Sequence, residues 1–138
     1  MAGWIDPTRD QLKAMSELSR QGPIWMLNLI RLRKTAKYEG REEATGAEAY
    51  AAYARESEPF FKAVGGKIIW SGAAELMVIG PEDERWDLCF VAEYPCVAAF
   101  ADMLGNPGYQ ATVRHRRAAV KDSRLLRIKP GAAGKVFA

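Results

Sequence analysis

Residues 87–117 constrain the fold of this chain more than any other stretch. An apolar strand over residues 87–94 stops at Pro95, and a helical run then extends to about Val120, broken at residues 105–108. Proline lacks a backbone donor and glycine favours turns, so both interrupt regular structure. A strand that leads into a broken helix predicts one crossover unit, in which the helix packs on a sheet.

A similar strand and helix come earlier in the chain. Residues 24–33 are apolar on both faces apart from Asn28, which predicts a strand, and the charged residues 34–43 predict a loop. The segment Thr45-Gly46-Ala47-Glu48 has the spacing of a capping box, so we expect a helix from there to about Val64. This helix is the second expected crossover.

Three further elements complete the order. An N-terminal helix is expected to begin at Asp6-Pro7 and to end at Gly22-Pro23. Residues 67–79 predict a long strand, and the polar turn at residues 80–85 predicts that it forms a hairpin with the next strand. A last strand is expected over residues 124–129.

The order of a helix followed by β-α-β-β-α-β predicts an α+β fold. Two right-handed crossovers joined by a hairpin give a ferredoxin-like sandwich, with a four-stranded antiparallel sheet and both crossover helices on one face. Residues 68–70 and 88–92 carry apolar side chains on both faces of their strands. Because two helices cover only one face, we expect a homodimer through sheet-to-sheet packing.

Length and composition indicate how many domains the chain holds and which classes of partner are not expected. The chain of 138 residues is expected to hold a single domain over residues 1–130, with a helical extension at 1–22, a core at 23–130 and a flexible tail at 131–138. A net charge of +3 is weak support for a polyanionic partner, so we expect no nucleic acid. No apolar segment approaches the ~20 residues that span a bilayer, so we expect no membrane partner.

The two cysteines and the absence of several sequence motifs limit the kinds of functional site that we expect. Cys89 and Cys96 form no C-x-x-C pair, which indicates reduced thiols in a cytoplasmic protein. Gly65 and Gly66 end a helix rather than open one, which is the wrong place for a phosphate. One histidine and two distant cysteines make no metal site, and no motif supports a serine hydrolase. We therefore expect no metal and no cofactor.

Several short motifs along residues 23–130 together carry a resemblance to a known family. As a set they resemble the dimeric α+β barrel superfamily and, within it, a widespread bacterial branch catalogued as a domain of unknown function. The motifs are Met26-Leu27-Asn28-Leu29, Ala49-Tyr50-Ala51-Ala52-Tyr53, Gly65-Gly66, Trp86-Asp87, Tyr94-Pro95, and Asn106-Pro107-Gly108-Tyr109 followed by Arg116.

The resemblance implies a pocket between the sheet and the helices of each subunit. Members of the superfamily include cofactor-independent oxygenases of aromatic polyketides, haem-degrading proteins, lactone isomerases and small-molecule sensing domains. Haem-degrading relatives use an asparagine, a tryptophan and an axial histidine. Asn28 and His115 match the first and last of these, but Tyr94 stands at the strand position, which argues against haem.

Asn28 and His115 are the candidate catalytic residues. Asn28 lies among apolar neighbours, so its amide must be hydrogen-bonded or face a wet cavity. It either braces the strand or dimer contact, or donates to a ligand carbonyl or dioxygen. His115 is the only side chain that titrates near neutrality without perturbation, so it is a candidate general base. The arginines around it favour the alternative of an exposed surface histidine.

Arg116 and the aromatic residues are the candidate ligand-binding residues. Arg116 either clamps an anionic group or forms an ion pair with Glu93 or Asp87. The aromatic side chains either pack in the core and interface or line a pocket for a flat, apolar ligand. Those assigned to the pocket are Tyr53, Trp70, Tyr94 and Tyr109.

Two classes of function remain open from the sequence. In the first, the protein is a cofactor-independent oxygenase or isomerase of a small apolar or aromatic compound. Asn28 would then polarise the substrate, His115 or a tyrosine would move a proton, and Arg116 would hold an anionic group. In the second, it is a non-catalytic ligand-binding or stress-associated module.

Overall fold

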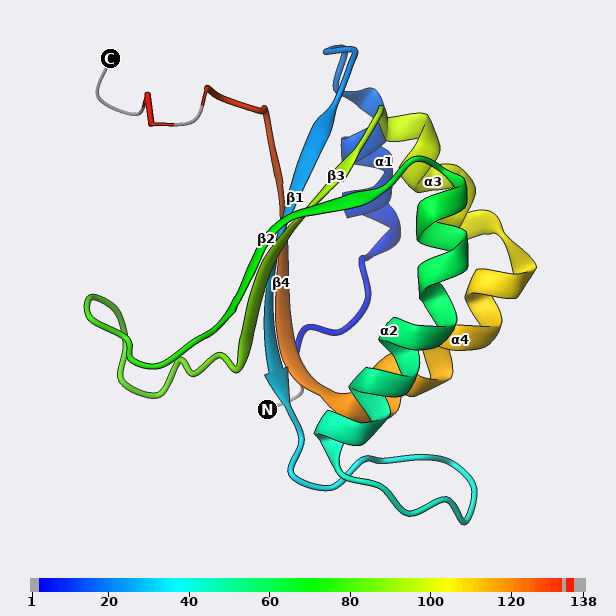
Figure 1. Ribbon diagram of the computed structural model, residues 1–138, viewed down its shortest axis with the longest axis vertical. Coiled ribbons are helices and arrows are strands. Elements are labelled where there is room, and N and C mark those ends of the chain that lie inside the picture. The colour runs from blue at the N-terminus through cyan, green and yellow to red at the C-terminus, as the bar shows by residue number, and fades with distance from the viewer. Residues whose placement is uncertain (1–2, 133, 136–138) are drawn as a thin grey trace.

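The computed structural model describes residues 3–132 and 134–135. At its centre is a four-stranded antiparallel sheet with the strand order β2-β3-β1-β4 (Figure 1). This architecture confirms the predicted α+β, ferredoxin-like fold class. The strands are β1 (Ile24–Leu32), β2 (Lys67–Ala73), β3 (Leu88–Tyr94) and β4 (Val120–Ile128).

The helices form a single layer on one face of the sheet (Figure 1). They are α1 (Arg9–Glu17), α2 (Gly46–Ala63), α3 (Val97–Gly105) and α4 (Pro107–Ala119). The predicted capping box starts α2: the Thr45 hydroxyl accepts from the Glu48 amide at 3.0 Å, and the Glu48 carboxylate accepts from the Thr45 amide at 2.9 Å. The predicted break between α3 and α4 lies at Asn106, whose side chain caps α4 through the Gly108 amide at 2.8 Å.

Alternation along β1 separates a helix-facing side of the sheet from an open side. Ile24, Met26 and Ile30 face the helices and have exposed fractions of 0%, 3% and 0%. Trp25, Leu27 and Leu29, which alternate with them, turn to the other side, here called the open face, where no helix of the described residues packs. The open face also carries Trp70 and Leu126, which are 50% and 58% exposed.

Three element boundaries differ from the sequence predictions. The first helix begins after Thr8 rather than Asp6, because Thr8 and Gln11 form a capping box, and it ends at Glu17. Strand β2 ends at Ala73 rather than Ile79, since β3 offers no ladder partner before Leu88. Strand β4 begins at Val120, directly after α4, instead of at residue 124.

Residues 74–87 therefore form a projecting loop, here called the arm, instead of strand and tight turn. The arm extends from the ends of β2 and β3 away from the helix layer (Figure 1). In the predicted flexible tail, residues 133 and 136–138 lie outside the described residues. Across the part of the chain that the structure describes, no helix combines the length and apolar character needed to cross a membrane.

Candidate functional site

A cavity lies between the helix layer and the helix-facing side of the sheet. The hollow has a volume of about 1370 Å³, and α2, α4, β1 and β3 all contribute to its walls. Glu84 of the arm and Leu126 of β4 also line it, so this volume extends beyond the space between sheet and helices onto the open face. The enclosed part is the candidate functional site.

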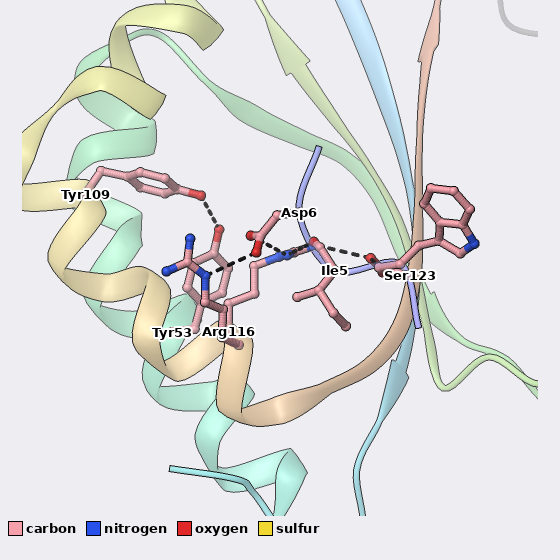
Figure 2. Close-up of polar contacts among 8 residues, drawn as sticks. Ile5, Asp6, Tyr53, Tyr109, Arg116 and Ser123 are labelled. Atoms are coloured by element: carbon pink, nitrogen blue, oxygen red, sulfur yellow. Dashed lines mark hydrogen bonds and ion pairs between the residues drawn. The ribbon is translucent and has the colours of Figure 1, made fainter. Parts of the chain in front are cut away.

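Tyrosines form one wall of the cavity. Tyr53 of α2 and Tyr109 of α4 place their hydroxyl oxygens 2.7 Å apart across the gap between the two helices (Figure 2). The Tyr50 ring lies 5.5 Å from the Tyr53 ring, centroid to centroid. Tyr94 projects from β3 into the same cavity and packs edge-on against Phe61 and Phe100 at 5.4 and 5.0 Å.

The helical repeat explains why these side chains converge. Residues 50, 53 and 57 of α2 and residues 109, 113 and 116 of α4 recur at intervals of three or four, so each set lies on one face of its helix. Both faces are directed towards the sheet. The two helices thereby bring aromatic and charged groups, which are distant in the chain, to one cavity.

Burial controls the ionisation of the tyrosines. It raises the pKa of Tyr109 well above its usual value, and the neighbouring Tyr53 hydroxyl adds to that shift, while the charge of Arg116 opposes it. Burial likewise raises the pKa of Tyr50 and Tyr94. These hydroxyls therefore stay protonated at neutral pH and act as hydrogen-bond donors.

Asn28 lies on the cavity side of the sheet. The pairing of β1 places it opposite Phe90 of β3 and Leu125 of β4, between the buried Met26 and Ile30 on the same face. Its side chain is half-buried, and Nδ2 donates to the Met26 carbonyl at 3.0 Å. The amide is thus held by its own strand, and its remaining hydrogen-bonding capacity is directed towards the cavity.

Arg116 is bound at one end of the cavity. Its guanidinium donates to the Ile5 carbonyl and to the Ser123 hydroxyl, the latter at 3.3 Å, and lies 4.0 Å from the Asp6 carboxylate (Figure 2). The predicted alternative of an ion pair with Glu93 or Asp87 is wrong. Glu93 accepts from Trp25 on the open face at 2.8 Å, and Asp87 accepts from the Leu32 amide at 2.7 Å.

Two of the partners of Arg116, Ile5 and Asp6, belong to residues 3–7, a segment here called the strap. The strap runs between α4 and β4 (Figure 2). The Trp4 amide donates to Asp122 at 2.9 Å, and the Trp4 carbonyl accepts from Ser123 at 2.6 Å. Trp4, Ile5, Asp6 and Pro7 all line the cavity, a contribution that nothing in the sequence pattern signalled.

His115 is buried, which corrects the expectation of an exposed histidine. Its side chain is 7% exposed, with Nδ1 2.6 Å from the Tyr38 hydroxyl and Nε2 2.8 Å from Glu56 Oε2. The second contact is close but not aligned as a hydrogen bond. His115 packs between α2, α4 and the loop after β1, and it does not line the cavity.

The structure brings together five of the predicted site residues and leaves two apart. Trp70 pairs with Val91 in the ladder, lies on the open face and is 50% exposed. Neither Trp70 nor His115 lines the cavity, so neither belongs to the site we describe. The residues that do line it together are Asn28, Tyr53, Tyr94, Tyr109 and Arg116.

Two solved structures resemble this chain at more than half sequence identity. A protein of unknown function from Rhodopseudomonas palustris, RPA0582, is 55% identical, with a TM-score of 0.89 over 94% of this chain and 98% of that one. The methylated RPA0582 protein is 54% identical, with a TM-score of 0.93 over 97% of this chain and 99% of that one.

A more distant likeness shows the fold alone. SnoaB, a cofactor-independent oxygenase from Streptomyces nogalater, is 16% identical, with a TM-score of 0.54 over 82% of this chain and 97% of that one. No curated protein matches the chain. The family model described as "Domain of unknown function (DUF1330)" matches residues 35–128. The chain therefore belongs to this DUF1330 family.

Proposed function

We propose that the protein binds a small, flat and mostly apolar molecule in the cavity between sheet and helices. One edge of this molecule carries oxygen atoms that accept hydrogen bonds, as a carboxylate, a carbonyl or a phenol does. The observation that supports this proposal is the convergence of protonated tyrosine hydroxyls and the Arg116 guanidinium on an aromatic-walled cavity.

Each polar group has a distinct part in the proposed recognition. The Tyr53 and Tyr109 hydroxyls share one hydrogen bond, so one of their two protons remains for a ligand acceptor. Arg116 attracts negative charge at the strap end of the cavity, and Asn28 offers an amide from the sheet. Tyr94 and its aromatic neighbours supply a surface for a flat ring.

The site favours binding over proton transfer. His115, a candidate general base, does not line the cavity. Burial raises the pKa values of Tyr50, Tyr94 and Tyr109, so these hydroxyls are poor bases at neutral pH. A non-catalytic binding module, working without a cofactor, is accordingly the first candidate.

A cofactor-independent oxygenase or isomerase is the second candidate. The likeness in fold to SnoaB supports it, as does the position of Asn28, which faces the cavity from the middle of β1. In this alternative Asn28 polarises the substrate and a tyrosine donates the proton. Oxygen uptake, measured with an electrode in the presence of an anthrone, distinguishes this candidate from simple binding.

Calorimetric titration with 2-naphthoate tests the proposal. We expect saturable binding that Tyr109→Phe weakens about five- to tenfold, because the variant keeps the ring and loses one hydrogen bond worth ~1 kcal/mol. Tyr38→Phe is the matched control, since Tyr38 lies outside the cavity, and it should leave the affinity unchanged. Equal affinity for all three proteins, or no saturation in the millimolar range, would contradict the proposal.

We also propose a homodimer formed through the open face in the cytoplasm. The exposed Trp70 and Leu126 support the interface, and the free Cys89 and Cys96 fit a reducing compartment. A distant fold neighbour from Bacteroides fragilis, 12% identical with a TM-score of 0.50, is described as a dimeric protein. Analytical ultracentrifugation of the wild type tests this state directly.

A further inference from the structure

The arm carries apolar side chains that nothing in the described chain covers. Leu76, Val78 and Ile79 are 81%, 83% and 92% exposed. They lie within four consecutive positions of the arm, which projects from the sheet on the side away from the helices (Figure 1). Large apolar side chains in a cluster with this exposure are typical of a surface that packs on another molecule.

The arm has a defined shape although its apolar residues face solvent. At its base, the Ala74 amide donates to the Asp87 carbonyl at 2.9 Å, and the Asp87 amide donates to the Ile30 carbonyl of β1 at 2.7 Å. At its bend, Gly80 has a φ of 147°, and a side chain there would overlap Met77. The arm is thus anchored and folded so that it presents these residues outward.

Charge indicates which kind of surface the arm fits. Its fourteen residues include five acidic and one basic side chain, in a chain whose overall charge is +3. Strand β4, at the opposite edge of the sheet, has the reverse character: Lys121 lies at its start, Lys129 follows its end, and Leu126 is exposed on the open face between them. The two edges of one molecule are complementary in charge, and both are apolar.

A two-fold axis parallel to the strands brings these edges together. In two sheets packed open face to open face, such an axis places the β2 edge of one copy against the β4 edge of the other. The arm leaves the sheet at the β2 edge, so in a dimer of this symmetry it would lie beside the partner's β4 edge, and the contact would occur twice.

We propose that the arm clasps a second copy of this chain: Leu76, Val78 and Ile79 pack at the β4 edge of its open face, and the acidic residues of the arm face the lysines of that strand. This inference rests on the homodimer proposed above and names the segment that stabilises it. The occupant is a second copy because the complementary surface is present on the chain itself.

Sedimentation equilibrium of a triple variant is the first test. Because all three residues are exposed in the protomer, Leu76→Ser/Val78→Ser/Ile79→Ser should keep its circular dichroism spectrum and raise the dimer dissociation constant at least tenfold. Leu18→Ser, which replaces a 54% exposed leucine far from the arm, is the control and should leave that constant unchanged. A triple variant that dimerises like the wild type overturns the clasp and leaves the homodimer standing; a monomeric wild type overturns the homodimer itself.

A charge-swap pair tests the proposed contact with β4. Glu75→Lys/Glu82→Lys/Asp83→Lys reverses the net charge of the arm, since two acidic and four basic residues then remain, and Lys121→Glu/Lys129→Glu makes the strand ends acidic. Each variant alone should dimerise at least tenfold more weakly than the wild type, because like charges then meet at both contacts. An equimolar mixture should recover dimers, since both contacts are complementary again. A mixture that associates no better than its separate components overturns the pairing of arm and β4.

Discussion

Arg116 joins parts of the chain that are distant in sequence. Its guanidinium connects α4 to the strap through the Ile5 carbonyl and to β4 through the Ser123 hydroxyl. The side chain is 16% exposed, so these contacts are largely shielded from water. Arg116 therefore has a structural role at the end of the cavity as well as the ligand-binding role that we propose.

Replacing Arg116 should lower stability. Arg116→Met keeps much of the side-chain volume but leaves the Ile5 carbonyl and the Ser123 hydroxyl without a donor, and we expect a loss of about 2 kcal/mol in the free energy of unfolding. Urea denaturation measures this loss. Arg114→Met is the control: its pair with Glu42 is exposed on both sides and should contribute less than ~1 kcal/mol. Equal effects of the two substitutions would contradict the structural role of Arg116.

The burial of His115 could not be predicted from the sequence. Its arginine neighbours predicted exposure, but adjacent helical residues point in different directions, and residue 115 lies on the side of α4 that meets α2. Tyr38 and Glu56, the groups that contact it, come from a loop and from another helix. Long-range contacts of this kind carry no local sequence signal.

At the scale of elements, periodicity predicted the order of strands and helices. Some predicted element boundaries were wrong, and each error has a physical reason. The apolar residues 76–79 suggested that β2 continued to Ile79, yet a strand needs a ladder partner and β3 begins only at Leu88. The resemblance implied a cavity between sheet and helices, and the candidate ligand-binding residues Tyr53, Tyr109 and Arg116 line the hollow described here. The strap was not predictable, because hydrogen bonds to distant residues hold it and it has no periodic pattern.

Two glycines at helix ends provide a matched test of local packing. Gly46 is the first residue of α2, and a side chain there would overlap the Arg33 carbonyl, whereas nothing lies within 4 Å of the position that a side chain would take at Gly105. Alanine normally stabilises a helix relative to glycine. We therefore expect Gly46→Ala to destabilise by about 1–3 kcal/mol and Gly105→Ala to stabilise by roughly 0.5 kcal/mol. Thermal and urea unfolding of both variants measure whether the changes in the free energy of unfolding have opposite signs. Changes of the same sign would contradict the close approach of Gly46 to the Arg33 carbonyl.

For the molecule as a whole, the buried tyrosines predict an alkaline limit to stability. In the unfolded chain the Tyr109 hydroxyl ionises near pH 10, and burial raises its pKa in the folded protein. Above pH 10 the folded state therefore holds a proton that the unfolded state loses. The stability contribution is complete below pH 10 and is lost as the pH rises towards the folded pKa.

Unfolding experiments between pH 8 and pH 11 measure this dependence. We expect the wild type to lose up to about 1.4 kcal/mol per pH unit above pH 10 for each such tyrosine. Tyr109→Phe removes one ionisation, so its free energy of unfolding should fall less steeply in the same range. Parallel curves for the two proteins up to pH 11 would show that Tyr109 ionises equally in both states.

The arm also has a consequence for the newly made chain, before any pairing. Leu76-Met77-Val78-Ile79 is a short run of apolar residues with high β-propensity, the type of segment that nucleates aggregation when it is left uncovered. Glu75 precedes the run, while Pro81 and the acidic residues after it follow, and such flanks act as gatekeepers against indiscriminate strand addition. The same carboxylates that we propose to guide one chain to its partner would then keep immature chains in solution until they meet it.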